Sequence, residues 1–325
     1  MKYAYKTEIK PTAEQIKKIR RSIGICRWLY NKYIETNKKL YRMYQRGLLD
    51  KNQPYFMTAN DFDKYVNNRL KTQEEYSWIN KCGSKARKKI LLNAECAFRN
   101  FFAGNTAFPK FKKKNDEDVK LYFPKNNIGD WTVERHRIKI PTLKYVRLKE
   151  YGYLPTDTKV INGSVSENAG RFYVSVTVEK EAAEYKADTD FIVLSIKITD
   201  KNPEKLQKKL NLQKRRLQRK NGSANKRKEL LKIKKTEQKI NRIKKDYLNK
   251  QIASIIKMKP EYLIMEDLNI NTLKTDRQIK KLTVKQKYYD LKNRLLIKCS
   301  KYNIELKQID TLENKAEKTV QINII

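Results

Sequence analysis

The first part of the chain alternates between apolar and polar positions and then changes to a helical spacing. Residues 3–9 alternate, which predicts a β-strand. Thr12 and Gln15 have the spacing of a capping box, so a helix is expected to begin there. Apolar residues then recur every three or four positions from Ile16 to Ile34, and similar patterns cover about 58–70 and 84–102. Residues 11–106 therefore predict a small helical domain.

Beyond Gly104 the apolar segments are short and have the length typical of β-strands. Strands are predicted at 121–123, 131–133, 137–140, 145–148, 159–166 and 172–179. Asn168-Ala169-Gly170 separates the last two and has the residues of a tight hairpin turn. We expect a small antiparallel β-barrel built from residues 1–10 and 107–181, into which the helical segment 11–106 is inserted.

The rest of the chain, residues 190–325, predicts an α/β domain that follows a polar linker at 182–189. Apolar strands are predicted at 191–196, 262–265 and 304–309, and a helix at about 284–302. Residues 201–250 are rich in Lys and Arg, and Asn221-Gly222-Ser223 breaks their helical stripes, so this segment predicts a basic helical hairpin. A plain coiled-coil arm is the alternative, but such an arm interleaves charges of both signs.

The net charge of the chain indicates a polyanionic partner, which the pattern of helices and strands alone does not. The chain carries 75 Lys and Arg against 36 Asp and Glu, a formal net charge of +39 over 325 residues. Such a chain repels itself unless a polyanion neutralises it, and nucleic acid is the polyanion that basic proteins bind by counterion release. A membrane-surface or ribosome-associated protein is the alternative. The basic residues run through the whole chain, which favours an extended binding channel.

Other chemistry is scarce. One histidine, His136, disfavours histidine-based catalysis, and four separated cysteines without a C-x-x-C pair disfavour a zinc site and a disulfide scaffold. No apolar run approaches the roughly 18 residues that span a bilayer, and the N-terminus lacks the apolar segment of a signal peptide. We therefore expect a cytoplasmic protein with no membrane partner.

Glu266 is the strongest hint of catalysis. A carboxylate at the end of an apolar strand is where RNase H-like nucleases hold a metal ligand, but two-metal cleavage needs several carboxylates. The first strand offers only Val193-Leu194-Ser195, and Asp200 lies past its end. Asp267 is expected to point to the opposite side from Glu266. The alternative is that Glu266 is a strand-end acid paired with a lysine.

Several segments, in this order, resemble the TnpB family of transposon-encoded RNA-guided nucleases, which are related to type V CRISPR effectors. They are YKTEIKPTAEQIKKIRRSIGICRWLYNKYI (5–34), AFRNFFAG (97–104), FPKFKKK (108–114), RIKIPTLKYVRL (137–148), SVSENAGRFYVSVTVE (164–179), LQKRRLQRKNGSANKRK (212–228) and YLIMEDLNINTL (262–273). The resemblance implies a multidomain α+β fold with a wedge-type β-barrel, an inserted helical recognition domain and a RuvC-like domain carrying the basic hairpin.

The chain departs from the family at its catalytic motifs. Val193 stands in place of the first Asp, Glu266 keeps the second acid, and Lys315 or Glu317 stands near the third. The C-terminal zinc ribbon is absent. The chain is thus most similar to TldR, the nuclease-dead TnpB-like repressors. This implies a degenerate RuvC domain with no catalytic residues, no Mg²⁺ site and no zinc.

The resemblance also implies partners and contact residues. A guide RNA and double-stranded target DNA are the expected partners of a prokaryotic, nucleoid-associated monomer that represses transcription by occupancy. Residues matching the family positions that read a short flanking DNA motif are Tyr55, Ser84, Lys88, Pro124 and Lys125. From their composition, two further groups are expected to contact nucleic-acid backbone: Lys110, Lys112, Lys113 and Lys114 beside Phe108 and Phe111, and Arg215, Arg216, Arg219 and Lys220.

Three alternatives remain open. The first is an active nuclease whose metal site is rebuilt from Glu266 with Asp200, Asp267 or Asp310. The second is an RNA- or DNA-binding remnant that uses no guide, which predicts steep salt dependence without sequence preference. The third is an inert transposon relic. Trp28, Tyr30 and Phe98 lie at helical spacing and are expected in the core.

Overall fold

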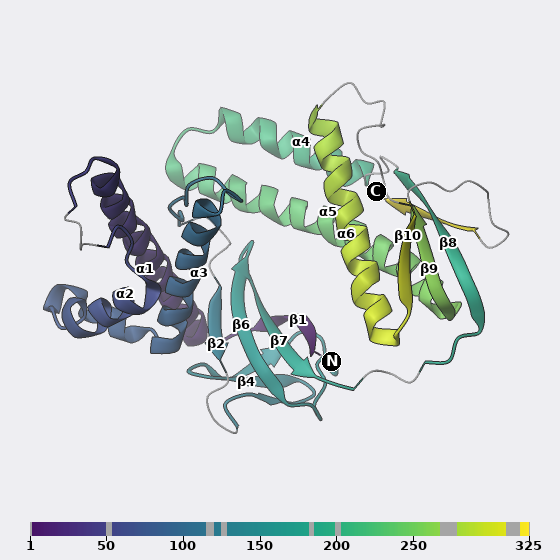
Figure 1. Cartoon of the computed structure of the whole chain (residues 1–325), viewed down its shortest axis with the longest axis horizontal. Helices are drawn as coiled ribbons and strands as arrows, with labels where there is room; N and C mark the ends of the chain where they lie inside the picture. The colour runs from purple at the N-terminus through teal and green to yellow at the C-terminus, as the bar shows by residue number, and fades with distance from the viewer. Residues whose placement is uncertain are drawn as a thin grey trace. The chain divides into compact units, whose positions relative to one another are not determined.

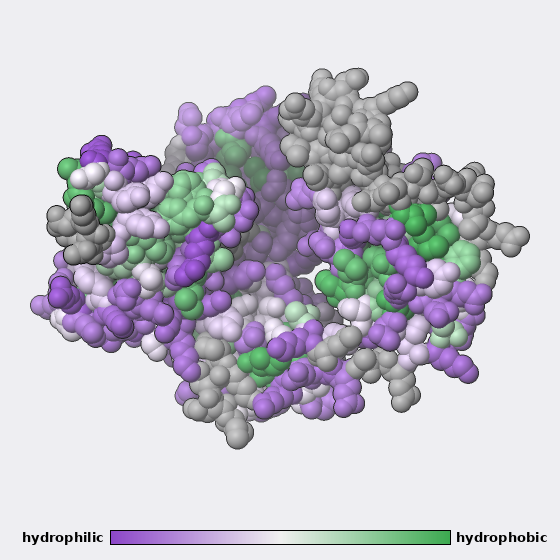
Figure 2. Space-filling view, viewed as in Figure 1, coloured by the Kyte–Doolittle hydropathy of each residue, from purple (hydrophilic) through white to green (hydrophobic). Residues whose placement is uncertain are grey.

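The structure is a computed structural model that describes residues 2–49, 54–114, 120–124, 129–181, 185–198, 203–266, 278–309 and 319–324. The chain divides into two compact units, residues 2–180 and residues 181–325 (Figure 1). The visible face of each unit is mostly hydrophilic, as the charge predicts (Figure 2).

The unit of residues 2–180 contains a seven-stranded antiparallel sheet. Its strands are β1 (Lys2–Lys10), β2 (Leu121–Pro124), β3 (Thr132–Val133), β4 (Arg137–Ile140), β5 (Lys144–Leu148), β6 (Val160–Asn168) and β7 (Arg171–Glu179). Their order is β2-β6-β7-β1-β5-β4-β3. Strand β1 pairs with β7 along its length and with β5 at its end, so the N-terminal strand joins the sheet as the sequence predicts.

Two small residues shape this sheet. Ala169 and Gly170 have φ angles of 51° and 76° and form the two-residue turn between β6 and β7, which confirms the predicted hairpin. Gly163 on β6 makes room for the indole of Trp131, which precedes the edge strand β3. Since β6 lies next to the other edge strand, β2, this contact requires the sheet to curl.

The helices of this unit are α1 (Ala13–Gln45), α2 (Ala59–Tyr65), a π-helical turn (Val66–Leu70), the 3₁₀ helix η2 (Glu74–Lys81) and α3 (Ser84–Phe102). Thr12 and Gln15 form the predicted capping box at the start of α1. The Gln15 Nε2 also donates to the carbonyl oxygens of Leu143 and Tyr145, each at 2.8 Å, which ties α1 to β5. Helix η2 is not predicted by the sequence pattern.

Helices and sheet in residues 2–180 share one apolar core. Leu29, Tyr33, Phe62 and Phe98 are buried in the helical part, and the core continues into the sheet at Val174. Tyr30 and Phe98 are buried as predicted. Trp28 was expected in the core but is only partly buried, because it lies at the edge of the helical cluster.

The unit of residues 181–325 is built on a four-stranded parallel sheet of order β10-β9-β8-β11. The strands are β8 (Thr189–Ile198), β9 (Pro260–Glu266), β10 (Glu305–Ile309) and β11 (Thr319–Ile324). Helices α5 (Ser223–Lys257) and α6 (Gln278–Tyr302) pack on the sheet face that carries Ile192, Leu194 and Leu263 (Figure 1). The sequence predicted β8, β9 and β10 but assigned no strand to residues 319–324.

Helix α4 (Glu204–Arg219) runs alongside α5 and forms the predicted basic hairpin (Figure 1). Its small core consists of Leu210, Ile233 and Ile240, with Leu206 and Leu217 packed against it. Gly222, at the break between the helices, has a φ of 90° that favours glycine. Throughout the described ranges, no helix is long and apolar enough to cross a membrane.

Candidate nucleic-acid interface

Residues 108–114, here called the basic aromatic strip, are anchored on α1. The Asn31 Nδ2 donates to the Lys112 carbonyl at 2.9 Å, and the Lys112 N–H donates to the Asn31 Oδ1 at 2.8 Å. The Lys112 Nζ lies 4.9 Å from the ring centroid of Tyr30, and the Lys38 Nζ lies 5.9 Å from those of Phe108 and Phe111. Ammonium groups thus rest on ring faces, where the attraction holds them in place.

The other lysines of the strip face outward. Lys110, Lys113 and Lys114 are exposed, whereas Lys112 is partly buried by its contact with Tyr30. Phe111 is 49% exposed. The strip therefore presents cations beside an open aromatic ring, which is the combination that single-stranded nucleic acid binds.

The structure does not gather the predicted flanking-motif residues into one cluster. Ser84 is the first residue of α3 and Lys88 lies one turn later, and both are exposed. The Lys89 Nζ sits 5.6 Å from the ring centroid of Tyr122, so this end of α3 faces β2, whose last residue is Pro124. Lys125 lies outside the described residues.

Tyr55 lies at the other end of α3. Its ring centroid is 4.9 Å from that of Tyr44 and 6.1 Å from that of Phe102, the last residue of α3. At 1.5 Å per residue, Ser84 and Phe102 are about 27 Å apart. Tyr55 therefore cannot read the same base pair as Ser84 and Lys88, although both groups are on the surface.

Arg215, Arg216 and Arg219 are exposed and occupy one side of α4, because residues one and four positions apart lie within about 100° of each other. Within the described ranges none of the three forms an ion pair. Lys220 differs, since its Nζ lies 4.0 Å from the buried Glu229 carboxylate. The three arginines, rather than Lys220, are available to track a phosphate backbone.

Val193, which the resemblance to the TnpB family matches to the first catalytic Asp, is 2% exposed. Its neighbours across the sheet are Ile264 on β9 and Thr319 on β11. Val193 points away from the core face that carries Ile192 and Leu194, because side chains alternate along a strand. On that second face the rings of Phe191 and Tyr262 stack with centroids 5.6 Å apart. The described neighbours of Val193 across the sheet thus carry no charged group.

The remaining acids cannot be assembled from the described residues. Glu266 is the last residue of β9 and pairs with Ile309, but its side chain lies outside the description. Asp200, Asp267, Asp310, Lys315 and Glu317 also lie outside it. Among the residues that are described, no three His, Cys, Asp or Glu side chains gather where they could hold a metal ion. The loss of the metal site stays a prediction.

Two of the buried cysteines are poor nucleophiles. The Sγ atoms of Cys26 and Cys82 are 3.8 Å apart, and their hydrogen bond and burial raise the pKa of Cys26 well above its usual value. Burial raises the pKa of Cys299 to about 11. Both thiols stay protonated near neutral pH, so neither offers a thiolate for catalysis.

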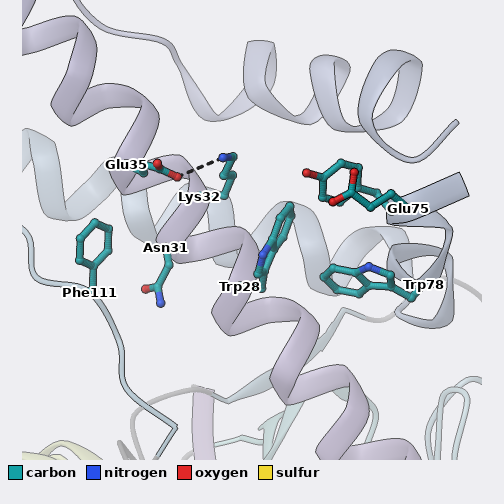
Figure 3. A pocket seen from close by; sticks show the side chains of 8 residues that line it. Trp28, Asn31, Lys32, Glu35, Glu75, Trp78 and Phe111 are labelled. Atoms are coloured by element: carbon teal, nitrogen blue, oxygen red, sulfur yellow. Dashed lines mark hydrogen bonds and ion pairs between the residues drawn. The ribbon is translucent and has the colours of Figure 1, made fainter. Parts of the chain in front are cut away.

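The structure also shows a pocket that the sequence analysis missed. Trp28 of α1 and Trp78 of η2 line it together with Phe111 of the strip (Figure 3). These residues come from three segments far apart in the chain, and η2 itself was not predicted. The only sequence signal was the density of aromatic residues.

Parts of this chain are similar in sequence to known proteins. Residues 1–46, which form β1 and the single long helix α1, match the family HTH_OrfB_IS605, described as a helix-turn-helix domain. InsQ of Escherichia coli K12, provisionally named an RNA-guided DNA endonuclease, is 27% identical over 83% of this chain and 67% of its own length. A protein of Streptomyces pristinaespiralis with the same provisional name is 24% identical over 95% of this chain and 78% of its own.

Among solved structures, a Cas12f1 complex with single guide RNA and target DNA gives a TM-score of 0.49 at 10% identity, covering 95% of this chain and 89% of that chain. The class that the matches indicate is that of proteins related to RNA-guided DNA endonucleases. The family match and the two relatives support the resemblance to the TnpB family that the sequence motifs indicate.

Proposed function

We propose that this protein binds a guide RNA, uses it to pair with target DNA, and represses transcription there without cutting. The guide would read the sequence by base pairing, and the protein would read only a short flanking motif. Within this proposal the protein is a TldR-like repressor. The single observation that carries the loss of cutting is the buried apolar position of Val193.

Nucleic-acid binding is supported by the net charge of the chain and by the positions of its exposed cations. The net charge is +39, and two groups of exposed cations occupy the basic aromatic strip and one side of α4. The provisional names of the two relatives specify an RNA guide and a DNA target. Ser84 and Lys88, in the part of α3 that faces β2, are the residues that we assign to the flanking motif, because Tyr55 is distant from them.

Loss of nuclease activity is supported by the chemistry around position 193. Two-metal cleavage needs carboxylates arranged around ions about 4 Å apart. Val193 supplies no ligand, and its neighbours Ile264 and Thr319 supply no carboxylate. The core face of the same sheet is intact, with Leu194 and Met265 fully buried. The fold of this sheet is thus intact around a position whose side chain cannot bind a cation.

The test is to purify the protein from cells that carry its native locus and to sequence the RNA that accompanies it. We expect one abundant species with a constant scaffold and a short variable end. Double-stranded DNA matching that end should be bound and, with magnesium present, remain intact, and a promoter carrying it should be silenced in a reporter. A broad mixture of cellular RNA would instead assign the charge to unguided binding.

Magnesium-dependent cleavage of the matching DNA would overturn the loss of activity. The Glu266→Ala variant is the control, because it should abolish such cleavage if the metal site has been rebuilt and should change nothing if the protein only binds. DNA binding without silencing of the reporter would refute repression while leaving guided binding intact.

A further inference from the structure

The pocket beside the basic aromatic strip is large enough for a small planar ligand. Its volume is about 400 Å³, within the range of roughly 300–1,000 Å³ typical of ligand sites. Trp28 lies between Trp78 on one side and Asn31 on the other, and Phe111 lies beyond Asn31 (Figure 3). The pocket therefore extends from η2 to the strip that carries Phe111.

The aromatic residues of this pocket are held in fixed positions. The ring centroids of Trp28 and Trp78 are 5.1 Å apart with the planes 80° to each other, and those of Trp28 and Tyr76 are 5.6 Å apart. All three are only partly buried, so part of each ring faces solvent. Asn31 fixes the strip that supplies Phe111 through its two bonds to Lys112. Such preformed rings bind flat ligands at low entropic cost.

Polar groups at the rim of the pocket favour ligands that carry hydrogen-bond donors. Glu35 and Glu75 both line the pocket, and the Lys32 Nζ lies 3.1 Å from the Glu35 Oε2 (Figure 3). Carboxylates accept hydrogen bonds only, so they favour ligands with N–H donors. The exocyclic amino groups of cytosine, adenine and guanine are such donors, whereas uracil has no amino group and offers only its N3–H between two carbonyl oxygens.

The surrounding charge distinguishes between the two ligand classes that aromatic rings with carboxylates can bind. A quaternary ammonium group is one, since cations bind ring faces. Here, however, Lys32 lines the pocket, the Lys38 Nζ lies 5.9 Å from the ring centroid of Phe111, and Lys110 and Lys114 extend the positive charge along the strip. Phosphates on either side of a bound base would meet these ammonium groups, whereas a cationic ligand would be repelled by them.

We propose that this pocket binds one unstacked nucleobase of a single-stranded segment of the protein's nucleic acid and prefers an amino-bearing base to uracil. This inference rests on the proposed function, because it assumes a nucleic-acid partner. Phe111 offers a stacking surface at the end of the pocket beside the strip, Trp78 offers one at the opposite end, and Glu35 and Glu75 supply the acceptors. The strip lysines hold the flanking phosphates.

The experiment measures binding of equal-length oligocytidine, oligoadenosine and oligouridine to the full chain, with tryptophan fluorescence as a second readout. We expect oligocytidine and oligoadenosine to bind more tightly than oligouridine and to quench the fluorescence. Phe111→Leu should weaken oligocytidine binding about tenfold, since one stacking contact is worth about one such factor. Tyr151→Leu is the matched control, because Tyr151 is also exposed but lies outside the pocket.

Two further variants test the roles of Trp78 and Glu75 separately. Trp78→Phe keeps an aromatic ring and should retain binding while losing part of the quenching. Glu75→Gln should reduce the preference for oligocytidine over oligouridine without a comparable loss of overall affinity. Equal binding of all three oligonucleotides, or an unchanged Phe111→Leu variant, would overturn the proposal.

The remaining outcomes separate this inference from the proposed function. Quenching by tetramethylammonium at concentrations where oligocytidine has no effect would identify a cation site and overturn the base pocket. If a guide RNA co-purifies and Phe111→Leu binds it with wild-type affinity, the pocket fails while guided binding stands. If no discrete RNA co-purifies but oligocytidine binding depends on Phe111, guiding fails and the pocket stands.

Discussion

Asn31 holds the backbone of Lys112 by two hydrogen bonds, donating to its carbonyl at 2.9 Å and accepting from its N–H at 2.8 Å. One side-chain amide on α1 thus replaces the strand partner that an extended segment would otherwise need. This contact places Lys112 over Tyr30 and Phe111 at the rim of the aromatic pocket. The position of the basic aromatic strip therefore depends on a residue 81 positions earlier in the chain.

Replacing Asn31 with Ala should release the strip. We expect a loss of about 1–2 kcal/mol in the free energy of unfolding, because two backbone groups lose their partners. RNA affinity should fall as well, since the strip cations are no longer held in one arrangement. Chemical denaturation and filter binding measure the two effects.

Lys112→Ala is the matched control for this change. It removes the ammonium group but keeps the backbone bonds to Asn31, so stability should be nearly unchanged while the salt dependence of RNA binding becomes shallower. If Asn31→Ala retains wild-type stability, the double hydrogen bond does not anchor the strip.

Replacing Arg215, Arg216 and Arg219 with Ala should weaken duplex binding and flatten its salt dependence. Each phosphate contact on duplex DNA contributes about 0.9 to the slope of log affinity against log salt, so the slope should fall by roughly 2–3. Titrations at several salt concentrations measure it. Lys250→Ala is the control, because its Nζ is 2.8 Å from the Asp246 carboxylate on the same hairpin. An unchanged slope in the triple variant would remove α4 from the interface.

Two glycines should respond in opposite directions to replacement with Ala. At Gly163 a new Cβ would lie 2.6 Å from Cζ2 of Trp131, so Gly163→Ala should cost about 1–3 kcal/mol through overpacking. At Gly24, inside α1, the nearest atom would be 4.0 Å away, and Gly24→Ala should stabilise by about 0.5–1 kcal/mol. Thermal unfolding compares them. Equal effects would contradict the contact between Trp131 and Gly163.

Most of the fold could be predicted from local patterns because each pattern is strong. The capping box at Thr12, the turn at Ala169-Gly170 and the break at Gly222 each fix an element boundary through backbone chemistry that the residues themselves dictate. The strand β11 could not be predicted in the same way. Its polar residues Gln321 and Asn323 obscure the strand pattern, and its place in the sheet comes from pairing with β8.

The candidate site was less predictable, because its residues meet only through tertiary structure. The basic strip and the hairpin arginines could be found from composition. The separation of Tyr55 from Ser84 could not, since it depends on which end of α3 each residue faces. The pocket combines Trp28 with Trp78 from a 3₁₀ helix of 8 residues, which is shorter than the roughly 11–18 residues over which a helical pattern is recognised.

The cysteines offer a test of burial that requires no substitution. Cys96 is exposed, whereas Cys26, Cys82 and Cys299 are buried. The raised pKa of Cys26 and Cys299 also keeps these two groups as thiols near pH 8, and the thiol form does not react. Iodoacetamide should therefore modify Cys96 first under native conditions, as mass spectrometry of the labelled peptides would show. Native labelling of Cys299 at the same rate would contradict its burial in the core between α6 and the sheet.

Introducing an acid at position 193 should destabilise the fold without producing cleavage. Val193→Asp places a carboxylate between Ile264 and Thr319 at a position that is 2% exposed, and burying an uncompensated charge costs several kcal/mol. Burial raises the pKa of a carboxyl group, so the penalty relative to wild type should be largest near neutral pH. The penalty should shrink as the pH falls below the raised pKa, because the acid then folds in its neutral form.

Val193→Ala separates the two effects of this substitution. It creates a small cavity but no charge, so its loss of stability should be smaller at neutral pH and nearly independent of pH. Urea unfolding at several pH values distinguishes the two variants, and a plasmid cleavage assay with magnesium measures activity. Robust cleavage by Val193→Asp would mean that the remaining metal ligands are present after all, within the segments around Glu266 or before β11. In that case a single substitution would convert the protein into a nuclease, and the other parts of the catalytic site would be intact.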